Sequence, residues 1–183
     1  MDRIYLDISQ WQKNIKYSKV KASGIDGVML RCGYTGYGAN RTLNKDALFD
    51  THYNGFTKEG IPVGVYWYSC AVTSKDAEKE ATMVLNLIKE KKISLPVVWD
   101  TEDPYWQGKV SKNKLTECAK TFCGAIEKAG YYAMIYASLS WFNNRLKLNE
   151  LEAYDKWVAA WAIRILQWNA VFGSIRLKVR SME

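Results

Sequence analysis

The sequence predicts an α/β fold in which a parallel sheet closes into an irregular, TIM-like β/α barrel. Segments rich in β-branched and aromatic residues alternate along the chain with segments of helical period. Repeated strand–helix units of this kind imply parallel strands joined by right-handed crossovers. About six such strands in one domain of 183 residues make closure into a barrel the natural solution.

The predicted elements follow one another in a regular order. Strands are expected at residues 4–9, 26–31, 62–70, 93–98, 131–138 and 157–161. Helices are expected at residues 17–22, 46–58, 74–89 and 112–129. Gly24, Gly60 and Gly130 stand where the first, second and fourth of these helices end, as glycine commonly does. The glycine-rich segment 33–38 is expected to be a loop.

Two acidic residues stand at the end of the most apolar strand. In Trp99-Asp100-Thr101-Glu102, strand alternation places the Asp100 and Glu102 side chains on one face, with Cα atoms about 6.5–7 Å apart. Mutual repulsion and burial would raise one pKa, which gives a protonated acid beside an ionised partner near neutral pH. The alternative is a solvated strand end whose acids pair with Lys or Arg.

Other polar residues end the neighbouring strands. Asp7, Arg31, Tyr68, Glu102 and Ser138 all fall at the carboxyl ends of predicted strands. Because barrel active sites lie at that end, this convergence favours catalysis over a solvated surface.

The composition excludes several kinds of site. His52 is the single histidine, which disfavours Ser-His-Asp, Cys-His and His-rich zinc sites, and we expect neither a metal nor a cofactor. The scattered cysteines are expected to be buried thiols made in a reducing cytosol: Cys32, Cys70, Cys118 and Cys123. Nothing near Met1 resembles a signal peptide, and no apolar stretch would span a bilayer, so we expect synthesis in the cytoplasm and no stable membrane insertion.

Charge and aromatic content indicate the kind of partner. A formal charge of +7 favours a polyanion, either nucleic acid or an anionic cell wall. The basic residues are spread around predicted helix faces, which disfavours a nucleic-acid partner. The 8 Trp and 12 Tyr suit stacking on sugar rings as well as core packing.

Seven short motifs occur in a fixed order along the chain. They are Asp7-Ile8-Ser9-Gln10-Trp11-Gln12, Arg31-Cys32-Gly33-Tyr34, Asp46 with Phe49 and Asn54, Gly64-Val65-Tyr66-Trp67-Tyr68-Ser69, Trp99-Asp100-Thr101-Glu102, Ile135-Tyr136-Ala137-Ser138 and Trp157-Val158-Ala159-Ala160-Trp161. Together they resemble glycoside hydrolase family 25, the Chalaropsis-type lysozymes of phage endolysins and bacterial autolysins. The resemblance runs from about residue 3 to residue 161.

The resemblance implies a barrel of eight strands with only about five helices, and a monomer that acts on the bacterial cell wall, outside the cell or after phage-type release. It implies cleavage of the β-1,4 bond between N-acetylmuramic acid and N-acetylglucosamine in peptidoglycan. Glu102 would be the general acid and then the base. Asp100 would orient the substrate's own N-acetyl group as the nucleophile, and Asp7 would support the site by charge and hydrogen bonding.

Four aromatic residues are candidates for the sugar cleft. Tyr66 and Tyr68 share one face of the third strand, while Tyr136 and Trp161 lie on later strands. Core packing is the alternative for each of them.

The last part of the chain departs from the family pattern. We expect a catalytic barrel over residues 1–161 and an atypical tail over residues 162–183, with at most a short last strand near residues 175–180. Three basic residues alternate with apolar residues in that segment and no acid is present, so a fourth site carboxylate has no candidate. The expected results are weak hydrogen-exchange protection of the tail and reduced activity. A glycan-binding remnant without turnover is the alternative to a hydrolase.

Overall fold

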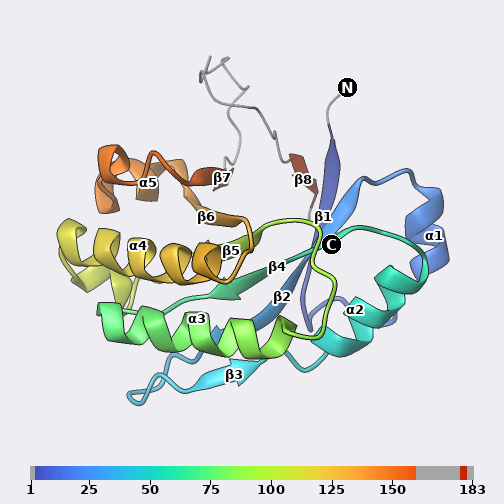
Figure 1. The fold of residues 1–183 in the computed structure, drawn as a ribbon, viewed down its shortest axis with the longest axis horizontal. Coiled ribbons are helices and arrows are strands. Elements are labelled where there is room, and N and C mark those ends of the chain that lie inside the picture. Colours follow the sequence, from blue (N-terminus) through green and yellow to red (C-terminus); the bar gives the residue numbers. More distant parts are fainter. Residues whose placement is uncertain (1–2, 160–177, 181–183) are drawn as a thin grey trace.

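The computed structural model describes residues 3–159 and 178–180 (Figure 1). The strands are β1 (Ile4–Ile8), β2 (Gly27–Thr35), β3 (Leu43–Lys45), β4 (Val63–Tyr68), β5 (Val97–Asp100), β6 (Ala133–Ser138), β7 (Asp155–Ala159) and β8 (Lys178–Arg180). The helices are α1 (Tyr17–Ala22), α2 (Phe49–Lys58), α3 (Ser74–Ile88), α4 (Lys112–Lys128) and α5 (Leu139–Arg145). Short 3₁₀ turns span Gln107–Lys109 and Leu148–Glu150.

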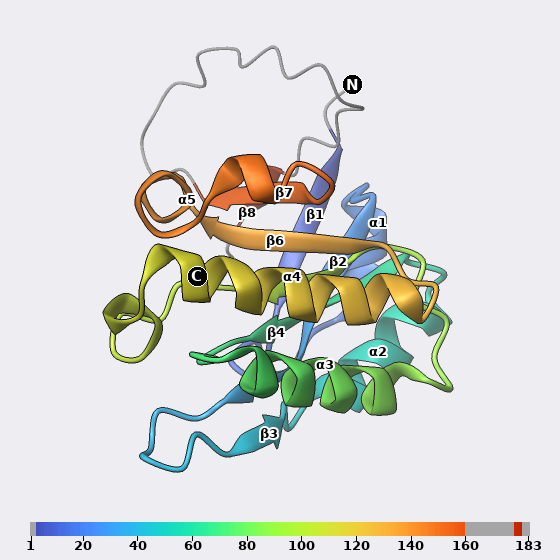
Figure 2. The ribbon, with the colours of Figure 1, turned by 60° about the vertical axis from the view of Figure 1, so that its left-hand side comes forward.

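The sheet is a curled half-barrel in which all neighbouring strands except β2 and β3 are parallel. Its order is β7-β6-β5-β4-β2-β1-β8, and β3 pairs antiparallel with β2 at the side of this path. Helices α2, α3 and α4 pack along one face of the sheet, as Figures 1 and 2 show. The predicted α/β fold is therefore confirmed in its parallel sheet and its five helices. Closure into a barrel of about eight strands stays a prediction, because residues 160–177 lie outside the described part.

Two hydrophobic clusters follow from the alternation of side chains along the strands. Outward-facing residues of the sheet, such as Val28 and Leu30, join α2, α3 and α4 in a large core. On the inner face, a small cluster forms under the concave side: Met29, Val98, Met134 and Trp157, with Leu95, Tyr66 and Tyr136 packed on it. The inner cluster is the apolar base on which the polar groups of the next section stand.

Several predicted boundaries are wrong, and each has a local cause. The segment 33–38 does not begin as a loop, because β2 continues through Thr35 and pairs with β3 after a register shift between Arg31 and Gly33. The fourth predicted strand begins at Val97 instead of residue 93, directly after Pro96, which has no N–H for the ladder.

Helix starts were also misplaced or missed. Helix α2 begins at Phe49 and not at Asp46, since the Asp46 carboxylate accepts hydrogen bonds from the backbone N–H of Leu48 and of Gln10. The sequence did not predict α5, whose first turn is capped by the Ser138 hydroxyl accepting from the Trp141 backbone N–H. Ser138 therefore ends β6 and caps a helix.

The structure also describes the cysteines and a short last strand, both of which the sequence predicted. All four cysteines are free and buried, as expected. A three-residue strand, Lys178–Arg180, pairs in parallel with Ile4–Leu6 of β1. Trp161 and most of the predicted tail lie outside the described part. Within that part, no helix is both long and apolar enough to cross a bilayer.

Candidate active site

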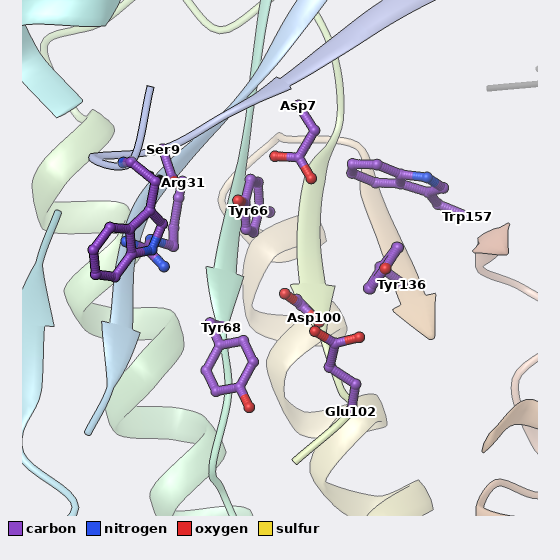
Figure 3. A pocket seen from close by; sticks show the side chains of 10 residues that line it. Asp7, Ser9, Arg31, Tyr66, Tyr68, Asp100, Glu102, Tyr136 and Trp157 are labelled. Atoms are coloured by element: carbon purple, nitrogen blue, oxygen red, sulfur yellow. Dashed lines mark hydrogen bonds between the residues drawn. The ribbon is translucent and has the colours of Figure 1, made fainter. Parts of the chain in front are cut away.

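A pocket of about 230 Å³ opens toward the carboxyl ends of the strands (Figure 3). Its walls are formed by Asp7, Ser9, Trp11, Arg31, Tyr66, Tyr68, Asp100, Glu102, Tyr136 and Trp157. The structure thus brings together six of the seven residues that the sequence marked as candidates. The seventh, Trp161, lies outside the described residues.

Strand register explains why these side chains meet. Tyr68 on β4, Asp100 on β5 and Tyr136 on β6 are direct partners across the parallel ladders. Register partners on adjacent strands point to the same face, so the three form one row. Asp7 comes from β1, and Glu102 follows two residues after Asp100, which keeps it on the same face. Figure 3 shows the Asp100 and Glu102 carboxylates side by side with Asp7 beyond them.

Asp100 is the most deeply placed of the three carboxyl groups. Its side chain belongs to a residue that is 5% exposed, and its Oδ1 atom has no hydrogen-bond partner among the described residues. Burial raises the pKa of Asp100 well above its ordinary value, and the charges of Glu102 and Asp7 raise it further. The Arg31 guanidinium acts in the opposite direction.

The other two carboxyl groups also hold protons more strongly than usual. Partial burial, followed by the Asp7 charge, raises the pKa of Glu102, which is exposed at the mouth of the pocket. Burial raises the pKa of Asp7 as well, although the Tyr66 hydroxyl and Arg31 oppose the shift. Burial therefore raises the pKa of all three groups, and charge repulsion adds to the shift at Asp100 and Glu102, the pair for which the sequence predicted one raised pKa.

Arg31 is a site residue to which the sequence assigned no role. Its Nε atom lies 2.8 Å from Oδ2 of the fully buried Asp46, and its guanidinium carbon lies 5.1 Å from the centre of the Tyr34 ring. Its Nη2 atom is buried and has no partner among the described residues. The ion pair fixes a positive charge beside the carboxyl groups and leaves the Nη2 group available to donate.

Aromatic rings form the floor and rim of the pocket. The Tyr136 and Trp157 rings pack edge to face, with their centres 4.9 Å apart. The Trp157 and Tyr66 rings pack in the same way, with their centres 6.3 Å apart. Tyr68 is tied to Tyr37 by a hydroxyl–hydroxyl hydrogen bond of 2.7 Å. Trp157 was predicted only as a strand residue, and Trp11 only as part of a motif. The Trp11 side chain is 72% exposed. The sequence alone does not reveal this exposure, so it could not predict Trp11 as a residue at the rim of the pocket.

The arrangement suits acid-assisted chemistry on a sugar. One group can stay protonated while a neighbour is ionised, and flat rings offer surfaces that match the C–H faces of sugars. Across the described residues, no three or more His, Cys, Asp or Glu side chains are arranged to hold a metal ion.

Most enzymes that hydrolyse glycosidic bonds use a pair of carboxyl groups in different protonation states, and the fold and pocket match what such an enzyme requires. The model of the family described as glycosyl hydrolases family 25 matches residues 6–175. The chain belongs to this family. This match ends at residue 175, whereas the resemblance seen in the sequence motifs ended at residue 161.

Solved structures agree with this assignment. The modular autolysin LytC from Streptococcus pneumoniae, in complex with a synthetic peptidoglycan ligand, is 25% identical, with a TM-score of 0.78 over 93% of this chain. The CTP1L endolysin (20% identity, TM-score 0.74, 89% of this chain) and the Clostridium perfringens spore cortex lytic enzyme SleM (19%, 0.72, 84%) share the fold.

The chain covers only part of each of these proteins. It spans 40% of the LytC chain, 54% of the CTP1L chain and 52% of the SleM chain. No curated protein sequence matches it.

Proposed function

We propose that this chain is a muramidase that cleaves the β-1,4 bond between N-acetylmuramic acid and N-acetylglucosamine in peptidoglycan. The observation that carries the proposal is the pairing of Asp100 and Glu102 in one pocket, both with raised pKa values. Family membership and the likeness to LytC, whose structure contains a synthetic peptidoglycan ligand, support it.

Glu102 is the proposed general acid. Burial and the charge of Asp7 raise its pKa, which favours the protonated acid, and its exposure at the pocket gives it access to a glycosidic oxygen. It protonates the leaving oxygen as the bond breaks. The resulting carboxylate then takes a proton from the water that attacks the anomeric carbon, which restores the acid.

Asp100 is the proposed partner of the substrate's N-acetyl group. Its Oδ1 atom is buried without a partner among the described residues, so it is available to accept from the acetamido N–H. Held in this way, the acetamido oxygen attacks the anomeric carbon from the side opposite to the leaving group. The configuration is retained after water completes the reaction. Asp7 and Arg31 set the charge balance around this group.

The aromatic residues hold the sugars in this proposal. Tyr66, Tyr68 and Tyr136 line the pocket and present rings to it. Trp161 keeps its proposed role only by its place in the family motif. We further propose that the protein acts as a monomer on the cell wall, without a nucleic-acid partner.

Glycan binding without turnover is not favoured, because Asp7, Asp100 and Glu102 share one pocket. The deciding experiment incubates the protein with purified peptidoglycan, reduces the new ends with borohydride and identifies them by mass analysis. Reduced N-acetylmuramic acid at the new ends is the expected product. Reduced N-acetylglucosamine would contradict the proposed bond, and retention on insoluble wall without any new ends would identify a binding protein.

A further inference from the structure

A second cavity, of about 540 Å³, lies beside the first and takes no part in the proposed reaction. It is formed by the segment after β1 and the beginning of α2, which lie side by side in Figure 1. Its lining is mostly apolar and includes Ile15, Tyr17 and Leu48, with Lys13 at its edge. Its volume falls in the range of ordinary ligand-binding pockets.

Trp11 joins the two cavities, because its side chain lines both. The turn that carries it is held in place: the Ser9 backbone N–H donates to Gln12 Oε1 at 2.9 Å, and the Gln12 N–H donates to the Ser9 carbonyl at 3.1 Å. Hydrogen bonds to Asp46 provide a second connection between the two cavities. The Asp46 carboxylate accepts from Arg31, which lines the first cavity, and from the backbone N–H of Gln10, which lines the second.

The segment that forms one side of the second cavity is basic, and Lys13 is the lysine of this segment that lines the cavity. Between Ser9 and Ile25 the chain has no acidic residue and four exposed lysines: Lys13, Lys16, Lys19 and Lys21. Within the described part of the chain, none of the four forms an ion pair. The cavity therefore combines a mostly apolar surface with the positive charge of Lys13, which fits a ligand that has small alkyl groups and a carboxylate.

We infer that this second cavity binds the peptide branch of peptidoglycan while the glycan occupies the first cavity. In peptidoglycan, N-acetylmuramic acid carries on its lactyl ether a short peptide with methyl side chains and free carboxylates. Because Trp11 lines both cavities, a branch on a sugar in the first cavity would pass Trp11 to enter the second. Lys13 would pair with a carboxylate, and Leu48 and Tyr17 would contact the methyl groups. The inference rests on the proposed function for its choice of ligand.

The kinetic test compares two forms of one substrate, soluble wall glycan with its peptides and the same glycan after an amidase has removed them. The measured quantity is kcat/KM for the peptide-bearing glycan divided by kcat/KM for the glycan without peptides. Lys13→Glu reverses the charge at the cavity edge, and Thr51→Trp fills the cavity from the exposed face of α2. We expect Lys13→Glu to lower the ratio about twofold to fivefold, as for the loss of one exposed ion pair, and Thr51→Trp to lower it because the side chain occupies the cavity.

Lys79→Glu is the matched control. Lys79 is exposed on α3 and does not line the second cavity, and the substitution changes the net charge by the same amount as Lys13→Glu. The ratio should stay at the wild-type value in this variant. An equal fall in all three variants would mean a general effect of charge, and an unchanged ratio in Lys13→Glu and Thr51→Trp would overturn the inference.

A binding measurement keeps the two proposals separable. N-acetylmuramyl-L-Ala-D-Glu-L-Lys and N-acetylmuramic acid are titrated separately into the wild-type protein and followed by NMR. We expect only the peptide-bearing compound to shift the amide signals of Lys13, Leu48 and Thr51. If those shifts occur while wall turnover is absent, the proposed reaction fails and the peptide site stands. If the two compounds give the same shifts, the peptide site is refuted whatever the turnover.

Discussion

Trp99 and Glu80 are joined by a hydrogen bond of 3.2 Å from the indole Nε1 to the carboxylate Oε2, inside a region with no exposed surface. The bond ties β5 to α3 on the face opposite to Asp100. Ser69, the first residue after β4, donates its hydroxyl to the same oxygen at 2.7 Å. One buried carboxylate thus holds the ends of the two strands that present Tyr68 and Asp100 to the pocket.

Glu80→Gln should weaken both the fold and the catalytic geometry. Oε1 accepts from the Thr35 hydroxyl and the Cys70 backbone N–H, while Oε2 accepts from Ser69 and Trp99. Whichever oxygen becomes an amide nitrogen, it then faces an N–H that can only donate. We expect a loss of about 1–3 kcal/mol in the free energy of unfolding, measured by urea denaturation.

Glu78→Gln is the control for this substitution, because Glu78 lies on the same helix with an exposed side chain. Its unfolding free energy should match that of the wild-type protein within about 0.5 kcal/mol. Equal stability of the two variants would show that the hydrogen bonds to Glu80 contribute little.

The sequence predicted the carboxyl groups of the pocket because their placement depends on short-range periodicity. Asp100 and Glu102 are two residues apart on a strand end, and period-two alternation is enough to put them on one face. Asp7 and Tyr68 were found by the rule that parallel strands end together. In each case the relevant information lies within a few residues of the side chain.

Other features depend on contacts between distant residues and could not be predicted in this way. The partner of Arg31 is Asp46, which lies on a different segment after the β2–β3 hairpin. That hairpin itself was missed, because β3 has only three residues and no apolar alternation. The contact of Trp157 with Tyr136 likewise depends on the register of β6 with β7.

Glu102→Gln should abolish nearly all hydrolysis of peptidoglycan. The amide cannot donate a proton to the leaving oxygen, and general acid–base catalysis contributes roughly 10²–10⁴-fold. Release of reducing ends from purified wall measures the loss, and wall retention measures binding, which should persist. Glu90→Gln is the control, since Glu90 is exposed after α3 and does not line the pocket. More than about a tenth of wild-type activity in Glu102→Gln would exclude this role.

Gly33→Ala should destabilise the protein, whereas Gly124→Ala should stabilise it. A Cβ atom on Gly33 would lie 2.3 Å from Cζ3 of Trp67 and 2.5 Å from the backbone oxygen of Asn44, so β2 or β3 must move. On Gly124, inside α4, the nearest atom is the Tyr154 hydroxyl at 3.9 Å. We expect a loss of about 1–3 kcal/mol for the first and a gain of about 0.5–1 kcal/mol for the second. Thermal unfolding of both variants tests the pair, and a stabilised Gly33→Ala would contradict the packing argument.

Asp100→Asn should raise stability at neutral pH while it lowers activity. Because burial raises the pKa of Asp100 in the folded state, the folded protein binds this proton more tightly than the unfolded chain does. The stabilisation from that proton is complete below about pH 4, the ordinary Asp range, and is lost as the pH rises through the folded-state pKa. The asparagine variant has no ionisable group here and avoids the loss.

The expected difference is therefore pH-dependent in a defined direction. At pH 7 the variant should have a larger free energy of unfolding than the wild type, because it lacks the carboxyl group whose ionisation burial disfavours. At pH 3 both side chains are neutral and nearly the same shape, so the two proteins should unfold together. Urea denaturation at the two pH values measures both differences. A variant that is less stable than the wild type at pH 7 would mean that ionised Asp100 is stabilised by its surroundings, contrary to its burial beside Glu102 and Asp7.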